Sequence, residues 1–387
     1  MPDLITTRLR HPSRPMTETR PSIRIAYVIP TLDQSGAERQ LALLATQLPT
    51  PEFQPHVIAL NRGGYYEEQI RRHGVSVDIL QKRFRFDPLT YIRLRRRLRQ
   101  LQPDIVQSFL FSANTYARLP GICPASAAIV VSERCVDSWK STWQLKIDRW
   151  LNNRMQAMTA NSESVATFYR ANAAVSSDRI RVIANGIPTA PEQSSSTVSL
   201  RAELKLPVDA KLVGFVGRFA KQKCLTDLMW AFQLLHQVID NVFLILVGDG
   251  PERDDLAALA RSFDCRDKVF FTGHRADAVE LMAQFNVFCL PSSFEGMSNS
   301  LMEAMACRVP VVVSDIPANL ELVVHEQNGL VVPLGQGPEL TRACQRILTD
   351  SVFAEQLGTA AKTTMQTKHS VERMVQQHAQ LYRELKS

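Results

Sequence analysis

Arg218 and Lys223 are two cations whose spacing suits chemistry on a phosphate group. Both follow the apolar run 211–216, which predicts a buried strand, and a helical pattern begins soon after them. A guanidinium and an ammonium placed together can hold a diphosphate and stabilise the negative charge that grows as it leaves. The alternative interpretation is that both are exposed loop cations without a ligand.

A second candidate site lies where a strand-like run leads into a helix predicted over residues 299–307. Ser298 or Asn299 can cap this helix, and its first N–H groups, notably those of Ser300 and Leu301, can hold phosphate oxygens. The start of this helix therefore predicts an anion-binding position.

Glu295 and Glu303 flank that helix end, and Glu303 lies four residues after Asn299 on the same helical face. Carboxylates accept paired hydrogen bonds from vicinal hydroxyls, such as those of a ribose or a hexose. The alternative is that Glu303 complements the helix dipole while Glu295 is an exposed loop residue.

Two further positions are open to two interpretations each. Residues 35–38 read Ser-Gly-Ala-Glu, which is the pattern of a capping box at a helix start. Gly36, which has no Cβ, could instead let that helix end approach a phosphate across an interdomain cleft. His274 follows another predicted strand and could present backbone groups to a nucleobase, or it could be a solvated side chain.

The sequence favours neither a metal site nor a bound cofactor. It contains no Asp-x-Asp pair, no P-loop, no Gly-x-Gly-x-x-Gly, no Gly-x-Ser-x-Gly and no His-x-x-x-His spacing. Its eight histidines form no cluster with metal-ligand spacing. We therefore expect chemistry without a metal ion or a serine nucleophile.

The elements that must position these residues alternate between strand and helix over 387 residues, a length that suits two domains. Six β-branched runs precede a Pro- and Ser-rich break, and six more follow it. The predicted fold class is α/β, with two doubly wound, Rossmann-like domains. We expect a disordered tail at residues 1–21, with an alternative start at Met16, and a first domain at 22–190. A linker at 191–200 then leads to a second domain at 201–368 and an amphipathic helix at 369–387.

Charge is distributed unevenly along the chain. Residues 1–200 hold 26 of the 45 Lys and Arg side chains but only 16 of the 38 Asp and Glu side chains. Segment 82–99 alone carries eight cations around Phe, Tyr and Leu side chains. Such a run is often a solvated helix face. The alternatives are an anionic membrane or lipid phosphate, and nucleic acid, which is disfavoured because no binding motif accompanies the charge.

Composition also bears on location. No apolar run approaches the roughly 18 residues of a transmembrane helix, and the first residues lack the apolar middle of a signal peptide. Seven cysteines without any Cys-x-x-Cys spacing indicate a reducing compartment. We expect a cytoplasmic protein, peripheral on the inner face of the cytoplasmic membrane if segment 82–99 binds lipid.

Four segments, in one order and spacing, resemble the donor half of the family-4 glycosyltransferases: residues 217–223, 248–256, 269–274 and 291–315. The first half is similar to the same family at residues 25–41, 103–119 and 159–170. The resemblance implies the B-type fold, in which two Rossmann-like domains face each other across a cleft and a C-terminal helix crosses back to brace the first domain.

The resemblance also implies roles for single residues. Arg218 and Lys223 would contact the nucleotide diphosphate, with Gly217 allowing close approach. Glu295 and Glu303 match the family's Glu-x7-Glu pair, the first binding hydroxyls of the donor sugar and the second the ribose. Catalysis would depend on Arg218, Lys223 and Glu295. Donor binding would also involve Gly36, His274, Gly296, Met297, Ser298, Asn299, Ser300 and Leu301.

This chain departs from the family pattern at several positions. Histidines that the family often carries beside Ser108 and near Glu133 and Arg134 are absent. These three residues are the acceptor contacts that the resemblance carries over. Cys224 and Arg308 stand where glycines are frequent in the family.

The implied activity is retaining, metal-independent transfer of a hexose or N-acetylhexosamine from a UDP- or GDP-linked donor to a lipid-linked or saccharide acceptor. The acceptor hydroxyl would attack from the leaving-group side and pass its proton to the departing phosphate. The setting would be cell-surface polysaccharide or lipopolysaccharide synthesis. The alternatives are a nucleotide-sugar epimerase and a non-catalytic nucleotide-sugar-binding subunit.

Overall fold

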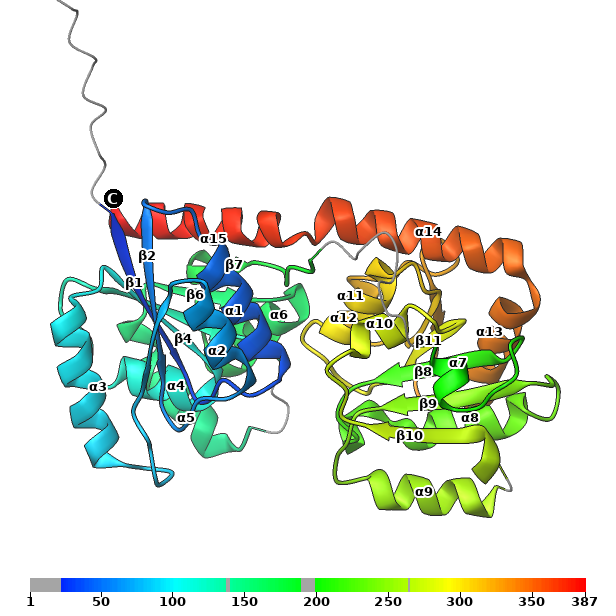
Figure 1. Cartoon of the computed structure of the whole chain (residues 1–387). Coiled ribbons are helices and arrows are strands. Elements are labelled where there is room, and N and C mark those ends of the chain that lie inside the picture. The colour runs from blue at the N-terminus through cyan, green and yellow to red at the C-terminus, as the bar shows by residue number, and fades with distance from the viewer. Residues whose placement is uncertain (1–21, 137–139, 189–198, 264) are drawn as a thin grey trace, which may run out of the picture.

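The computed structural model describes residues 22–136, 140–188, 199–263 and 265–387. These residues form two α/β domains that lie side by side and are bridged by two long helices (Figure 1). The predicted tail 1–21 and most of the predicted linker 191–200 lie outside the described residues.

The first domain contains the strands β1 Ile23–Ile29, β2 Phe53–Ala59, β3 Ser76–Ile79, β4 Ile105–Phe109, β5 Ala128–Glu133, β6 Ala157–Ala160 and β7 Ile180–Val182. Its helices are α1 Gly36–Gln47, α2 Tyr65–Arg72, α3 Pro88–Leu101, α4 Leu110–Arg118, α5 Thr142–Leu151 and α6 Glu163–Ala173.

The second domain contains the strands β8 Lys211–Val216, β9 Val242–Val247, β10 Val269–Gly273, β11 Val287–Leu290, β12 Val311–Ser314 and β13 Leu330–Val332. The remaining helices are α7 Leu200–Glu203, α8 Leu225–Leu235, α9 Arg253–Ser262, α10 Ala278–Met282, α11 Asn299–Ala306, α12 Pro317–Leu320, α13 Gly337–Thr349, α14 Ser351–Lys368 and α15 Val371–Lys386.

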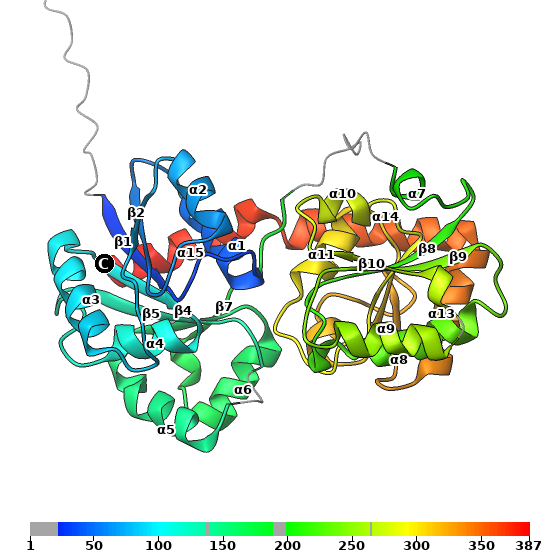
Figure 2. The same cartoon turned by 60° about the horizontal axis from the view of Figure 1, so that its bottom comes forward.

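Both sheets are parallel and doubly wound, as predicted. The first has the order β3-β2-β1-β4-β5-β6-β7 and the second the order β10-β9-β8-β11-β12-β13. Continuous apolar strands such as β9 suit this arrangement, because helices cover both faces of each sheet (Figure 2). The strand order reverses at β1/β4 and at β8/β11, and ligands bind beyond the carboxyl ends of the strands at such points.

The sequence predicts six strands in the first domain, whereas the structure has seven. The additional strand is β6, whose four residues read Ala-Met-Thr-Ala. This segment has no run of β-branched residues, so its composition does not distinguish it from a loop. It forms a strand because β5 and β7 pair with it on both sides.

The chain crosses between the domains twice, and the two crossings lie against each other. The Ile187 N–H, after β7, donates to the His369 carbonyl between α14 and α15, at 2.9 Å. A Cβ on Gly186 would lie 2.7 Å from the Val371 Cα, so only glycine permits this approach. Helix α14 packs on the second domain and α15 on the first (Figure 1).

Helix α15 contributes to the core of the first domain. Its Val371, Met374, Leu381 and Tyr382 are buried in the same cluster as β1, β2 and α1. The Tyr382 hydroxyl donates to Gln107 on β4 and lies 3.0 Å from the Tyr27 hydroxyl on β1. The helix therefore supplies both apolar burial and hydrogen bonds to this sheet.

Two buried histidines, His369 between α14 and α15 and His378 within α15, should make the stability of the protein depend on pH. Burial lowers the pKa of His378 to about 3 and that of His369 to about 4. The unfolded chain binds protons on both near pH 6.5, so the stabilisation is complete above that pH and is lost as the pH falls towards 4. The maximum slope is about 1.4 kcal/mol per pH unit for each histidine.

Urea titrations between pH 7 and 4.5 check this. We expect His378→Gln to have a flatter pH dependence of the unfolding free energy than the wild type. The control, His73→Gln, alters an exposed histidine and should keep the wild-type slope. Equal slopes for all three proteins would contradict the assignment.

Candidate functional site

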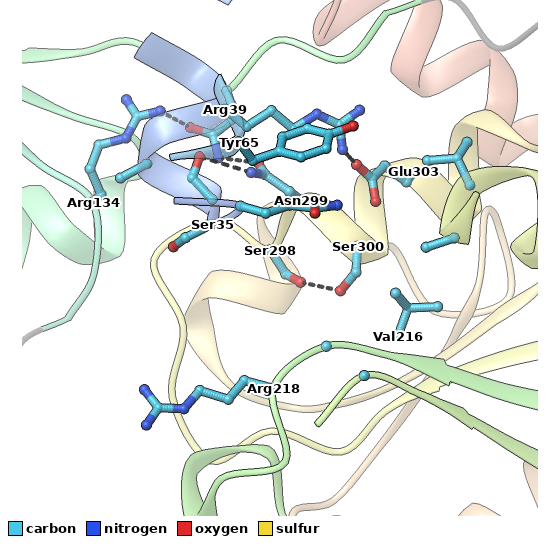
Figure 3. Close-up of a pocket in the computed structure, with 18 of the residues that line it drawn as sticks. Ser35, Arg39, Tyr65, Arg134, Val216, Arg218, Ser298, Asn299, Ser300 and Glu303 are labelled. Atoms are coloured by element: carbon cyan, nitrogen blue, oxygen red, sulfur yellow. Dashed lines mark hydrogen bonds and ion pairs between the residues drawn. The ribbon is translucent and has the colours of Figure 1, made fainter. Parts of the chain in front are cut away.

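The loops at the carboxyl ends of both sheets enclose a cleft of about 1190 Å³ between the domains (Figure 3). Segments after β1, β2, β4, β5, β6 and β7 form one wall, and loops after β8, β9, β10 and β11 form the other. Both strand-order reversals therefore open into the same space. Thirteen of the predicted site residues line it: Gly36, Arg134, Gly217, Arg218, Lys223, His274, Glu295, Gly296, Met297, Ser298, Asn299, Ser300 and Glu303.

The loop after β8 carries the two predicted cations. The Lys223 ammonium forms an ion pair with Glu295, and the neighbouring Gln222 amide donates to the Phe294 carbonyl at 2.7 Å. The loops after β8 and β11 are thereby joined. Arg218 projects into the cleft and forms no ion pair with any described residue (Figure 3). It is free to meet an anionic ligand.

Helix α11 begins with Ser298 as its N-cap, and the Ser298 hydroxyl accepts a hydrogen bond from the Leu301 N–H at 3.4 Å. The sequence predicts that this N–H holds a ligand oxygen. The structure corrects that prediction, because the N–H is already used in the cap. The Leu301 side chain is fully buried in the core of the second domain and does not line the cleft.

Glu303 forms an ion pair with Arg39, which extends from α1 in the opposite domain (Figure 3). Both carboxylates of the Glu-x7-Glu pair are therefore matched by a cation, Glu295 by Lys223 and Glu303 by Arg39. Pairing lowers the cost of holding these charges in a half-closed site. An ionised carboxylate has about four acceptor positions, so each keeps some for hydroxyl groups.

Asn299 and Asn185 form the centre of the contact between the walls. The Asn299 amide donates to the Gly36 carbonyl at 3.1 Å, and its Oδ1 accepts from the Asn185 amide at 2.8 Å and the Gln40 amide at 3.2 Å. The Asn185 amide also donates to the Met297 carbonyl at 3.1 Å. Gly36 therefore allows close approach, and its immediate neighbour is the Asn299 side chain.

The predicted capping box at residues 35–38 does not form in its usual way. Ser35 is the N-cap of α1, but its side chain makes no cap hydrogen bond. Glu38 is buried, and burial raises the pKa of its carboxyl group. Its Oε1 accepts from the Thr31 hydroxyl at 3.3 Å. The start of α1 is thus left open towards the cleft.

The predicted acceptor residues separate into two groups. Arg134 lines the cleft, and its guanidinium donates to Asn185 at 2.7 Å. Burial lowers the pKa of Arg134 to about 10, so it remains charged at neutral pH. Ser108 and Glu133 are buried and are not among the residues that line the cleft.

Glu133 belongs instead to a buried ionic cluster behind the cleft wall. Its Oε1 lies 3.7 Å from the Lys140 ammonium, which lies 3.0 Å from Asp148, and Asp148 is paired with Arg118 at 2.5 Å. The cluster joins the end of β5 to α4 and α5. Its geometry places Glu133 in a structural network, away from the ligand space.

Gly296 determines how closely the two walls approach. A Cβ at this position would lie 2.1 Å from the Arg134 carbonyl oxygen and 2.9 Å from the Cys135 Cα, both in the other domain. Backbone atoms cannot shift as a flexible side chain can, so any larger residue must separate the walls. The sequence predicts a donor contact here and does not indicate this interdomain contact.

Sequence reasoning missed Arg39 and Asn185, which line the cleft, and Gln40, which is buried in the contact between its walls. Arg39 and Gln40 directly follow the Ser-Gly-Ala-Glu pattern, and Asn185 precedes Gly186 at the end of the first domain. Their positions near glycines at element ends are the only signals that could have marked them. Their partners in the second domain lie more than 110 residues away in the chain.

His274 lines the cleft with an exposed side chain, at the end of β10. The adjacent Arg275 is held by Glu203 at 2.5 Å and Asp277 at 2.8 Å. Among the described residues, no group of three or more His, Cys, Asp or Glu side chains could hold a metal ion. Within that same part of the chain, no helix is both long and apolar enough to cross a membrane.

Two family models match the two halves of the chain. The one described as Glycosyltransferase Family 4 matches residues 34–191, and the one described as Glycosyl transferases group 1 matches residues 197–364. The chain therefore belongs to the family-4 glycosyltransferases, as its motifs predict.

Similar curated proteins are glycosyltransferases. The chain is 30% identical over 203 residues to the lipopolysaccharide core biosynthesis glycosyltransferase LpsD of Rhizobium meliloti, covering 52% of this chain and 57% of the relative. It is 27% identical over 275 residues to the 2-deoxystreptamine glucosyltransferase of Streptomyces kanamyceticus, covering 67% and 71%. The chain spans about half the length of the first curated relatives it matches.

The solved structure of HepE from Anabaena in complex with UDP-glucose superposes with a TM-score of 0.81 at 23% identity. The match covers 94% of this chain and 100% of HepE. Likeness at this identity confirms the B-type architecture of two Rossmann-like domains.

Gly296→Ala should separate the walls of the cleft, because its Cβ would overlap the Arg134 carbonyl. We expect at least a tenfold loss of affinity for a ligand that contacts both walls, with little change in melting temperature, since neither hydrophobic core is altered. Isothermal titration with UDP and GDP measures the affinity. The control is Gly337→Ala, whose Cβ would lie 3.8 Å from its nearest neighbour. Unchanged affinity in Gly296→Ala would contradict this role.

Proposed function

We propose that the protein transfers a sugar from a nucleoside-diphosphate donor to a hydroxyl group of a lipid-linked or saccharide acceptor, with retention of configuration. The observation that carries this is the convergence of Arg218, Lys223, Glu295 and the start of α11 at one strand-order reversal, directly opposite the first domain. Binding two substrates on opposite walls brings their reacting groups together.

Two observations support the donor part of the proposal: the positive charge in the cleft and the similarity of the fold to that of HepE. Arg218 and the start of α11 can meet a diphosphate, and HepE has been solved with UDP, with UDP and glucose, and with UDP-glucose. We assign the donor as a UDP- or GDP-linked hexose or N-acetylhexosamine. Glu295 would bind hydroxyls of the sugar and Glu303 those of the ribose.

The chemical step requires stabilisation of the leaving group above all. As the bond from the anomeric carbon to the phosphate oxygen breaks, Arg218 and Lys223 neutralise the charge that develops on the diphosphate. The acceptor hydroxyl attacks from the same side and passes its proton to the departing phosphate oxygen. In this scheme Lys223 and Arg218 supply the positive charge, so we propose that no metal ion is needed.

We assign the acceptor to cell-surface polysaccharide or lipopolysaccharide synthesis at the cytosolic face of the membrane. LpsD and LpsE of Rhizobium meliloti, both named for lipopolysaccharide core biosynthesis, are among the similar proteins. The surface of the first domain gives this proposal independent support.

That surface, which we call the basic aromatic face, combines segment 82–99 with α5. Phe84 is 70% exposed and Trp150 63% exposed, and the Arg85 guanidinium lies 4.9 Å from the centre of the Trp143 ring. Every exposed charged side chain on α3 and α5 is basic: Arg93, Arg96, Arg99, Lys146 and Arg149. Exposed aromatic rings among cations suit the interface of an anionic bilayer.

This face also adjoins the cleft. The Trp143 ring lies 6.2 Å from that of Phe111, and the preceding residue, Leu110, lines the cleft. A membrane bound at the basic aromatic face would therefore lie beside the wall assigned to the acceptor. We propose that a lipid-linked acceptor enters from this side.

Replacement of Lys223 tests the transferase proposal. Lys223→Ala should lower the rate of transfer about 10²-fold, since it removes one stabilising charge from the leaving diphosphate. The control is Lys221→Ala in the same loop, which removes an exposed lysine that does not line the cleft. An NMR time course with UDP- and GDP-sugars, with and without membrane extract, follows the anomeric proton and the free nucleotide.

We expect nucleotide release that depends on the extract, a retained anomeric configuration and no effect of EDTA. Isomerisation of the donor without extract would identify an epimerase instead. Donor binding without turnover would identify a non-catalytic subunit.

The membrane proposal predicts a salt-sensitive association with anionic vesicles. Each cation near such a surface contributes about 1 kcal/mol, so Arg96→Gln, Arg99→Gln and Trp150→Ala together should weaken binding at least tenfold. The control, Arg261→Gln with Trp230→Ala, removes an exposed cation and a tryptophan that is 52% exposed from the second domain. Vesicle sedimentation at 0.15 M salt measures the binding, and equal binding by both variants would exclude this surface.

A further inference from the structure

Glu321 makes a direct connection between the domains, away from the residues that line the cleft. Its two carboxylate oxygens, on the second domain, accept hydrogen bonds from the backbone N–H groups of Glu163 and Ser164, each at 2.8 Å. The Ser164 hydroxyl also donates to it. These are the first two residues of α6 in the first domain.

The contact completes the N-terminal cap of α6. The Ser162 hydroxyl accepts from the Val165 N–H at 3.2 Å. Glu321 accepts from the N–H groups of the two residues before Val165. A helix N-terminus carries a partial positive charge and unpaired N–H donors, so a carboxylate placed there is stabilising. Here the helix and its capping carboxylate belong to different domains.

On the second domain, Glu321 is exposed, and it is positioned by its backbone, whose N–H donates to the Pro317 carbonyl at 3.2 Å. It directly follows α12 and precedes Leu322 and Val323, both of which are buried. The Asn319 amide donates to the Ser314 carbonyl at 3.0 Å, and the Ser314 hydroxyl donates to the Ser292 carbonyl at 2.5 Å. Ser292 lies three residues before Glu295, so this network ends at the donor loop.

On the first domain, the contact lies just behind the cleft wall. Asn161, two residues before α6, lines the cleft, and its amide donates to the Arg134 carbonyl at 3.1 Å. That carbonyl is the atom that faces Gly296. The same chain segments therefore carry the Glu321 contact and the closest approach of the two walls.

We propose that Glu321, Glu163 and Ser164 form an interdomain latch that favours the closed arrangement of the cleft. The hydrogen bonds can form only when the domains are in contact, so they stabilise the closed state and contribute nothing to an open one. A contact of this kind shifts the ratio of closed to open molecules by about three- to tenfold. The identity of the ligand that the closed cleft encloses, the sugar donor, rests on the proposed function.

This proposal has a kinetic consequence. For a ligand that needs the closed state, the apparent affinity is the intrinsic affinity multiplied by the fraction of molecules that are closed. Loss of the latch should raise the donor KM, by at most the same three- to tenfold factor, and should not lower kcat, because no group that touches substrate is changed. A purely structural defect would lower the melting temperature without raising KM at an unchanged kcat.

The test compares two helix caps. Glu321→Ala removes the cap across the domains, and Ser164→Ala removes only the hydroxyl hydrogen bond. Asp350→Ala is the matched control, because Asp350 caps α14 within the second domain by accepting from the Phe353 N–H at 2.9 Å, and alanine removes that cap. Small-angle X-ray scattering of the ligand-free proteins measures the radius of gyration, and hydrogen exchange measures protection of the Glu163 and Ser164 amides.

We expect Glu321→Ala to increase the radius of gyration and the exchange at both amides, and Ser164→Ala to do so to a smaller extent. Asp350→Ala should change neither. An unchanged radius of gyration and donor KM in Glu321→Ala, with a fall in melting temperature like that of Asp350→Ala, would reduce Glu321 to a helix cap and overturn the latch. Neither scattering nor hydrogen exchange requires turnover. Both measurements would therefore still test the latch if the transferase proposal failed.

Discussion

The side-chain amide of Asn185 is the contact on which the arrangement of the cleft depends. It donates to Met297 and Asn299 in the second domain, and its oxygen accepts from Arg134 in the first. Asn185 is almost completely buried, so a lost partner would leave a desolvated polar group. The two domains are doubly wound in the same way, but each carries only one wall of the cleft. Asn185 connects these walls at the point where the chain leaves the first domain.

Most of the charged side chains discussed in the cleft are paired with each other before any ligand binds. Lys223 meets Glu295 within the second domain, and Arg39 meets Glu303 across the domains. Arg218 has no such partner among the described residues, and it therefore offers its charge to a ligand without first breaking an ion pair. A site organised in this way spends little energy on rearrangement when a dianionic group enters. The carboxylates are held in place with acceptor positions still available.

Much of the second domain could be predicted from the sequence, because its strands are continuous apolar runs and its site residues follow them directly. The same reasoning failed where a role depends on a distant partner. Strand β6 exists because two neighbours pair with it, and Gly296 is required by a carbonyl from the other domain. Glu133 resembles an acceptor contact in sequence, but a buried lysine from a later segment is placed against it. Local patterns contain no information about such tertiary neighbours.

Helix α15 makes the core of the first domain depend on a segment that follows the second domain in the chain. The core of the first domain includes Val371, Met374 and Tyr382, which are separated from β1 by the whole second domain. During synthesis the first domain emerges from the ribosome early, but its apolar surface beside β1 and α1 stays uncovered until residues 371–386 follow. The second domain can thus complete its own core before the first, although domains generally fold in the order of their synthesis. In the cell, the first domain is therefore synthesised first but completes its core last. Until then it has an exposed hydrophobic face that a chaperone could recognise.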